Sequence, residues 1–240
     1  MKKNRLMAGV ASLLLASAPV VVPQAATAAP FDLAHSNALV SSSDRIEDEL
    51  VSFFDRYGVP KTQQQGLIDK LNNGVAWDSM SGASPVTTET SRVGASDVTI
   101  ERYADGSVVV STIDAVPENP DDPMPAGISS CRLVSSSNYH ANYKNCFANV
   151  EFGVWQMGFH FDRNTVKGRV GSITRYYGMT HRLIGGSLSN HRFTKFSSSR
   201  VRYSANLSVL FKGFPAGWTA WMEVRLGTGG AAWTVHNFKS

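Results

Sequence analysis

The sequence predicts an α+β N-terminal unit followed by an all-β antiparallel, sandwich-like domain. Between residues 46 and 71, apolar side chains recur at the spacing of amphipathic helices. From residue 98 onward they alternate with polar side chains, which is typical of antiparallel strands with one solvent-facing side. A proline-rich stretch, 117–127, separates the two patterns and predicts an extended linker. We therefore divide the chain into a signal peptide (1–28), an acidic helical-hairpin and β-hairpin unit (29–116), this linker, and a basic sandwich domain (128–240).

The first residues have the three parts of a secretory signal peptide. Residues 1–5 carry three basic side chains, residues 6–22 are mostly apolar, and residues 26–28 form the small-residue triplet Ala-Thr-Ala. The uninterrupted apolar part is short for a transmembrane anchor, and a cleavage triplet follows it. We expect cleavage after Ala28 and a secreted, extracellular protein without an integral membrane segment.

Two helices are predicted at the start of the acidic unit. The first begins at a capping-box-like pair, Asp44 and Glu47, and ends at Gly58. The second begins with Thr62 and stops before Asn-Gly at 73–74. Because the connection is short, the helices should be antiparallel.

A strand hairpin is predicted next, with β-branched runs at 98–103 and 107–113 around an Asp-Gly turn. Residues 81–97 are rich in Ser, Thr and Gly and predict a loop. An isolated hairpin is marginally stable. We therefore expect it to pack on the helices, on the basic domain or on a partner's sheet edge.

The basic domain is predicted to contain about seven short strands with glycine-containing turns. The side chains expected to point into its core are Trp155, Met157, Phe159, Phe161, Val201, Tyr203, Ala205, Leu207, Val209, Phe211, Trp218, Ala220, Met222, Val224, Leu226, Trp233 and Val235. Further strands are expected at 130–136, 146–152 and 187–196, whereas 170–184 fits either a strand or a short helix.

The two cysteines, Cys131 and Cys146, are predicted to form a disulfide, because two cysteines in a secreted chain most often pair. A reactive thiol with His140 as its base is a disfavoured alternative. A metal site built from the same three residues is also disfavoured, since paired metal ligands usually lie two to four residues apart.

Charge is segregated along the chain. Residues 29–122 contain 16 Asp or Glu and 6 Lys or Arg, whereas residues 123–240 contain 3 and 14. The net charges are −10 and +11. Three interpretations remain open: each half is a solvated surface of its own sign, the halves dock on each other, or the basic half binds an external polyanion.

The candidate binding site consists of basic side chains spaced along the predicted strands, because spaced Arg and Lys recognise phosphate-rich polymers without catalysis. The candidates are Arg169, Arg175, Arg182, Arg192, Lys195, Arg200 and Arg202. The expected partner is an anionic cell-wall polymer, or the acidic half through intramolecular docking. No specific nucleic acid is expected.

No motif in the sequence names a reaction. Gly-x-Ser-x-Gly, His-Glu-x-x-His, the phosphate loop and the dinucleotide fingerprint are missing, and the acids of the linker lack the spacing of a calcium loop. We therefore expect no enzyme activity, no catalytic residue, no cofactor and no metal. His160, His181, His191 and His236, which lie among arginines, leave a histidine-dependent phosphodiester hydrolase as an alternative.

Two blocks of the sequence resemble a group of uncharacterised secreted proteins of actinobacteria and related Gram-positive bacteria. The first block comprises 53–59 (FFDRYGV), 64–71 (QxxLIxKL), 77–79 (WDS), 85–86 (PV) and 102–111 (RYxDGSVVVS). The second comprises 130–131 (SC), 145–146 (NC), 184–187 (IGGS) and 232–233 (AW). The resemblance implies secretion, a two-part architecture and the cysteine pair, and it transfers no activity or functional residue.

These observations favour a secreted, non-enzymatic binding or interaction module for an anionic cell-envelope polymer. The first alternative is a secreted antagonistic protein, similar to a bacteriocin or toxin, which its acidic half masks. The second alternative is the phosphodiester hydrolase.

Overall fold

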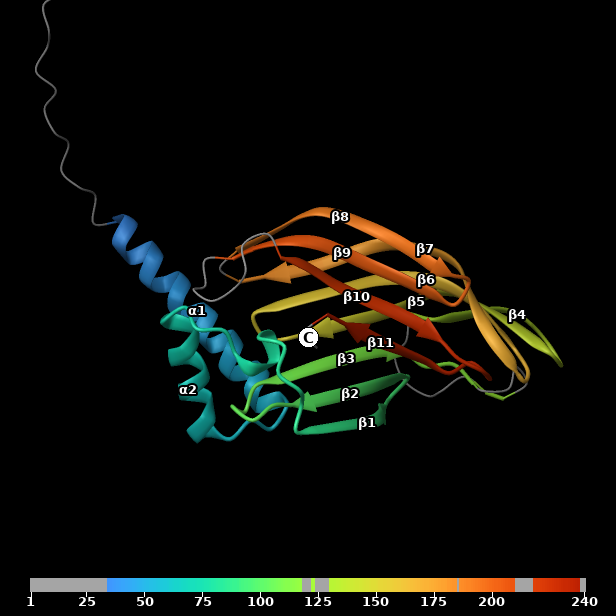
Figure 1. The fold of residues 1–240 in the computed structure, drawn as a ribbon, viewed down its shortest axis with the longest axis horizontal. Coiled ribbons are helices and arrows are strands. Elements are labelled where there is room, and N and C mark those ends of the chain that lie inside the picture. Colours follow the sequence, from blue (N-terminus) through green and yellow to red (C-terminus); the bar gives the residue numbers. More distant parts are fainter. Residues whose placement is uncertain (1–33, 118–121, 124–129, 185, 210–217, 238–240) are drawn as a thin grey trace, which may run out of the picture.

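The computed structural model describes residues 34–117, 122–123, 130–184, 186–209 and 218–237. The expected signal peptide, most of the expected linker and Phe211 lie outside the described residues, as does the side chain of Val209. Within the described ranges, antiparallel strands predominate and two helices precede them, which confirms the predicted order of helical and strand segments (Figure 1). Across the same ranges, no helix combines the length and apolarity needed to cross a membrane.

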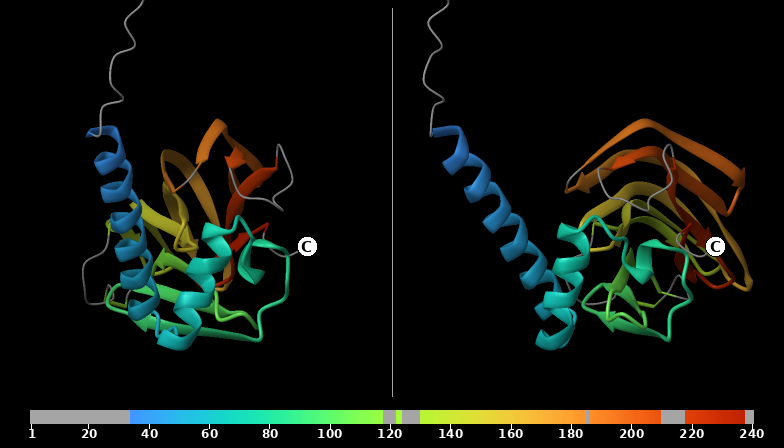
Figure 2. Two further views of the ribbon diagram at one scale, coloured as in Figure 1. Left: turned by 90° about the vertical axis from the view of Figure 1, so that its left-hand side faces the viewer. Right: turned by 60° about the vertical axis from the view of Figure 1, so that its left-hand side comes forward.

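The two helices, α1 (Ala34–Arg56) and α2 (Lys61–Asn72), pack against each other at one end of the sheets (Figures 1 and 2). Trp77 precedes the short 3₁₀-helix η1 (Asp78–Met80) and is fully buried. Its Nε1 donates a hydrogen bond to the carbonyl of Leu67 at 2.8 Å, and its ring lies 5.5 Å from that of Phe54. The other apolar side chains buried in the helical unit are Leu50, Phe53, Val59, Ile68, Leu71 and Met80.

The predicted start of the first helix was wrong. α1 begins at Ala34, so Asp44 lies inside the helix and not at its N-terminus. A capping box marks a place where a helix can begin, but its Asp and Glu also fit inside a helix that has started upstream. The following turns have the positive φ angles that glycine tolerates, 67° at Gly58 and 68° at Gly74.

The first sheet has the strand order β1-β2-β3-β5-β6-β7, and β4 also pairs with β5. All its pairings are antiparallel. Its strands are β1 (Thr87–Val93), β2 (Ser96–Arg102), β3 (Val108–Asp114), β4 (Arg132–Ser137), β5 (His140–Glu151), β6 (Trp155–Val166) and β7 (Arg169–Leu183).

One segment of this sheet differs from the sequence-based expectation, and a second segment settles a choice that the sequence left open. Residues 81–97 were predicted to form a loop, yet β1 lies within them and pairs with β2 along its whole length. Every side chain of β1 is exposed, so this strand has no apolar face that a period of two can reveal. Residues 170–184, which fitted a strand or a short helix, belong mostly to β7.

The second sheet has the order β11-β10-β9-β8 and packs over the first (Figure 1). Its strands are β8 (Gly186–Ser197), β9 (Arg200–Val209), β10 (Thr219–Leu226) and β11 (Ala232–His236). The predicted inward side chains of β6, β9 and β10 are at most 5 % exposed where they are described, except Trp218, which precedes β10 and is half-buried. The prediction for Trp233 was wrong, because this residue is 44 % exposed and pairs with the outward-facing Arg225.

The strand hairpin of the acidic half belongs to the same sheet as the strands of the basic half. β3 pairs with β5 from Val110 opposite Glu151 to Ile113 opposite Ala148. Buried residues from both halves form one hydrophobic cluster. The expected boundary at 117–127 therefore lies between two parts of one sheet.

The predicted disulfide between Cys131 and Cys146 is confirmed. Both cysteines are buried. The bond ties the segment that precedes β4 to the middle of β5, across a sequence separation of 15.

Candidate functional site

The outer face of the second sheet carries a cluster of arginines around one carboxylate. On β9, Val201 and Tyr203 point into the core, so Arg200 and Arg202 point outward. The antiparallel register places Arg202 opposite Glu223 on β10, and Arg200 opposite Arg225. Like charges opposite each other are destabilising, and the carboxylate of Glu223 lies where it offsets this repulsion.

Glu223 is fully buried and accepts hydrogen bonds from all three arginines. Nε and Nη2 of Arg200 donate to its Oε1 at 3.1 Å each, and Nε and Nη2 of Arg202 donate to its Oε2 at 3.2 and 3.0 Å. Nε of Arg225 donates to Oε1 at 2.6 Å. Burial raises the pKa of Glu223, but the hydrogen bonds from Arg225, Arg200 and Arg202 outweigh burial and lower this pKa below its ordinary value. One negative charge therefore holds three positive charges, and the cluster keeps a net positive charge.

Aromatic rings flank this cluster. The guanidinium carbon of Arg202 lies 3.6 Å from the centroid of the Trp221 ring and 4.8 Å from that of Phe196. The guanidinium carbon of Arg200 lies 5.5 Å from the Phe196 ring, which is itself half-exposed. We call Phe196, Arg200, Arg202, Trp221, Glu223 and Arg225 the arginine face.

The arginine face has the chemistry of an anion-binding surface. A guanidinium carries five N–H donors, and the bonds to Glu223 leave several donors on each arginine for another acceptor. Hydrogen bonds and ring contacts also restrict the rotamers of Arg200 and Arg202. Binding an anion therefore costs less side-chain entropy than it would at freely moving arginines.

Of the seven predicted binding residues, the structure brings three together. Arg192 on β8 lies opposite Ser204 and donates to its hydroxyl at 3.2 Å, which places it on the same face as Arg200 and Arg202 and nearer to Arg202. Lys195 instead donates to the carbonyl of Ile173 on β7 at 3.2 Å.

The remaining three predicted residues lie on β7, in the other sheet. Arg169 is exposed at the start of that strand, and Arg175 stacks over Tyr177 at 4.8 Å. Arg182 donates to Glu49 at 2.7 Å and to Glu151 at 3.2 Å. These three arginines therefore do not belong to the arginine face.

The sequence-based site omitted Arg225. The signal was nevertheless present, because Arg225 shares the outward alternation of Trp221 and Glu223. Its importance comes from the register of β9 and β10, which the sequence does not show.

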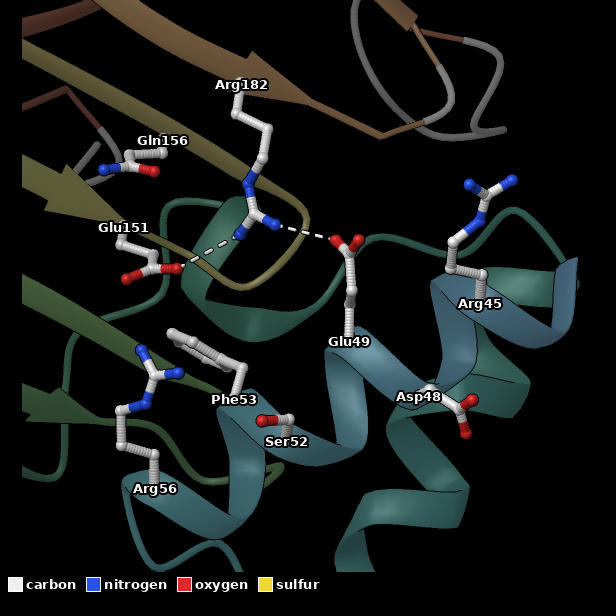
Figure 3. A pocket seen from close by; sticks show the side chains of 9 residues that line it. All are labelled: Arg45, Asp48, Glu49, Ser52, Phe53, Arg56, Glu151, Gln156 and Arg182. Atoms are coloured by element: carbon white, nitrogen blue, oxygen red, sulfur yellow. Dashed lines mark hydrogen bonds and ion pairs between the residues drawn. The ribbon is translucent and has the colours of Figure 1, made fainter. Parts of the chain in front are cut away.

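Arg182 lines a cavity of about 530 Å³ between α1 and the first sheet (Figure 3). Its guanidinium extends to Glu49 on the helix and Glu151 at the end of β5. The charged side chains that line the cavity are Arg45, Asp48, Glu49, Arg56, Glu151 and Arg182. The ion pair between Arg182 and Glu49 joins the two halves at this cavity.

The four histidines of the alternative hydrolase lie at separate places, except for one pair. The rings of His181 and His191 stack with centroids 4.4 Å apart, and Nδ1 of His191 lies 2.8 Å from the hydroxyl of Tyr203. Burial lowers the pKa of His181, and the neighbouring His191 lowers it further. His236 lies 3.1 Å from Glu101 in the core.

His160 contacts the rings of Phe147 and Tyr177, away from the histidine pair. Among the described residues, no group of three or more His, Cys, Asp or Glu side chains is arranged to hold a metal ion.

Comparison with known proteins gives no relative, because no family model, no curated protein and no solved structure matches the chain.

Proposed function

We propose that this protein is a secreted, non-enzymatic binding module for an anionic cell-envelope polymer, and that the arginine face is its binding surface. The observation that carries the proposal is the convergence of Arg200, Arg202 and Arg225 on a single buried carboxylate. The surplus positive charge is held in a fixed geometry beside exposed aromatic surface. Arginine recognises phosphate and carboxylate groups by paired hydrogen bonds, and a polymer presents many such groups in series.

The location of the neutralising carboxylate favours binding over masking. Glu223 belongs to the basic half, so the counter-charge that the described residues supply to the arginine face comes from the basic half itself. The ion pairs described between the halves lie elsewhere, at Arg182 with Glu49 and at His236 with Glu101. The antagonistic alternative, in which the acidic half masks the basic half, gains no support from this geometry.

Retention of the purified protein on heparin–agarose and on immobilised polyphosphate tests the proposal. We expect elution at a defined salt concentration, and earlier elution for Arg200→Gln/Arg202→Gln. This double variant should reduce the slope of log affinity against log salt by roughly 1 to 2. The matched control is Arg169→Gln/Arg175→Gln, which removes the same charge from β7. Equal weakening by the two double variants, with unchanged melting temperatures, would show that retention follows net charge and not this face.

The histidine pair favours phosphodiester hydrolysis as a second candidate function. Two imidazoles 4.4 Å apart, one of them within hydrogen-bond distance of Tyr203, can act as a general acid and a general base. Turnover of bis(p-nitrophenyl) phosphate that is lost in His181→Ala and in His191→Ala would support this candidate. Binding to polyphosphate without such turnover supports the non-enzymatic module.

A further inference from the structure

We infer that the cavity beside Arg163, between the two sheets, is a binding site for a small monoanionic carboxylate. This site is separate from the arginine face. Arg163 lies on β6 and continues the inward alternation of Phe159 and Phe161. Its neighbours in the first sheet are Tyr143 on β5 and Ile173 on β7.

The guanidinium of Arg163 is buried without a hydrogen-bond partner. Arg163 is 1 % exposed, and none of its three side-chain nitrogens makes a hydrogen bond among the described residues. The hydroxyls of Tyr143 and Thr165 are buried in the same interior and lie near each other, and neither makes a hydrogen bond of acceptable geometry within the described part of the chain. A buried charged donor without an acceptor is strongly unfavourable, so these groups together indicate a missing acceptor.

Space for such an acceptor is present. Arg163 lines a cavity of about 170 Å³, which equals the liquid volume of roughly five to six water molecules. The other lining residues are Arg92, Asp97, Asp114, Ala115, Val116, Gly230, Ala231 and Ala232. Thr165 lies next to this wall, because a Cβ placed on Gly230 would come 3.3 Å from its Cγ2 atom.

The two carboxylates of the wall are already engaged. Asp97 pairs with Arg92, while Asp114 accepts hydrogen bonds from the backbone N–H of Phe147 at 2.8 Å and the hydroxyl of Ser96 at 3.4 Å. Neither lies within ion-pair distance of Arg163, although the negative charges of both raise the pKa of Arg163 from farther away. Burial lowers the pKa of Arg163 to about 10, so the guanidinium is still charged at neutral pH.

The wall also selects the class of anion. A carboxylate accepts two parallel hydrogen bonds from a guanidinium, which matches the free donors of Arg163. The negative charges of Asp97 and Asp114 disfavour a dianion such as sulfate or hydrogen phosphate more than a monoanion. The volume is sufficient for a ligand of a few heavy atoms, such as formate or acetate.

Thermal unfolding of the purified protein in chloride-free buffer tests this site. Formate and acetate should raise the melting temperature in a saturable way, because a ligand that binds only the folded state stabilises it. Sodium sulfate at equal ionic strength stabilises by exclusion from the protein surface, so its effect should not saturate. Arg163→Met removes the charge at similar volume and should abolish the saturable rise. Arg175→Met, an exposed arginine on the adjacent strand, is the matched control and should retain it.

Ligand-detected NMR with acetate measures binding to the wild-type protein independently of stability. Tyr143→Phe should weaken this binding, and it locates the site even if Arg163→Met does not fold. Three results would each overturn the proposal. The first is no saturable binding of formate or acetate to the wild type, which means that water alone fills the cavity. The second is binding to Arg163→Met and Tyr143→Phe that equals binding to the wild type, and the third is tighter binding of sulfate than of acetate.

Discussion

The arginine face and the interior beside Arg163 place the same side chain in opposite surroundings. At the surface, Arg200 and Arg202 share a carboxylate, contact aromatic rings and remain partly exposed. In the interior, Arg163 is 1 % exposed, its guanidinium carbon lies 6.0 Å from the centroid of the Tyr143 ring, and it finds no hydrogen-bond partner among the described residues. All three arginines count equally toward the +11 of residues 123–240. Net charge therefore describes attraction at long range, whereas burial and strand register decide which arginine has free hydrogen-bond donors for a ligand.

The largest expected effect concerns packing. It tests whether the inward-facing side chains form a packed core while the arginine face is a surface. Phe159 is fully buried, with its ring centroid 5.3 Å from that of Phe193 on the opposing sheet. We expect Phe159→Ala to lower the free energy of unfolding by about 3–5 kcal/mol. Phe196→Ala, on the half-exposed arginine face, should cost less than about 1 kcal/mol. Chemical denaturation measures both, and similar losses would contradict the assignment of faces.

The next effect concerns the carboxylate of the arginine face. Glu223→Gln leaves three arginines without a counter-charge and should lower stability by about 2–3 kcal/mol. This value is below the 3–5 kcal/mol typical of fully buried pairs, because the arginines are partly exposed.

The same carboxylate predicts a pH dependence. The folded-state pKa of Glu223 is below its ordinary value of 4.5, so its contribution is complete above that value and is lost as pH falls through the lowered pKa. Wild-type protein should therefore lose stability in this acidic range more steeply than Glu223→Gln. Urea denaturation at each pH measures the free energy of unfolding of both proteins. The same dependence on pH in both would show that the arginines do not stabilise the carboxylate.

Substitution of the interior Arg163 should raise the free energy of unfolding, whereas substitution of the surface Arg202 should lower it. Arg163→Met replaces a buried charge that makes no hydrogen bond among the described residues with an apolar side chain of similar size. Asp97 and Asp114 attract this charge only from beyond ion-pair distance, so we expect a gain of about 1–3 kcal/mol in anion-free buffer. Arg202→Met removes hydrogen bonds to Glu223 and a ring contact, and should cost about 1 kcal/mol. A loss of stability in both variants would contradict the prediction that Arg163 destabilises the fold while Arg202 stabilises it.

Sequence alternation predicted the packed interior well, because buried strands must place apolar side chains on one face. Trp155, Met157, Phe159 and Phe161 are all buried as expected. The same alternation continues to Arg163 and Thr165, where the side chains become polar while the face stays inward. A reading based on polarity stops at this change and misses the buried arginine.

The candidate site was predictable only in part, because its contacts depend on register and on long-range pairing. Arg200 and Arg202 share a strand and alternate outward, so their grouping follows from local sequence. Their link to Glu223 needs the pairing of β9 with β10. Arg182 was also selected as a basic residue on a predicted strand, but it donates a hydrogen bond to Glu49, which lies 133 residues away in sequence.

The smallest expected effect lies where the edges of the two sheets meet, at the His181–His191 pair. Burial and the neighbouring His191 hold the pKa of His181 below its ordinary value of 6.5. As pH falls below 6.5, the unfolded chain binds this proton before the folded protein does, so stability decreases until the lowered folded-state pKa is passed. NMR titration of the imidazole resonances should show a lower midpoint for His181 than in an unfolded reference peptide. His191→Ala should raise that midpoint only part of the way, because burial, the larger cause, remains. A midpoint that returns fully to the reference value would show that the neighbouring His191 alone lowers the pKa of His181.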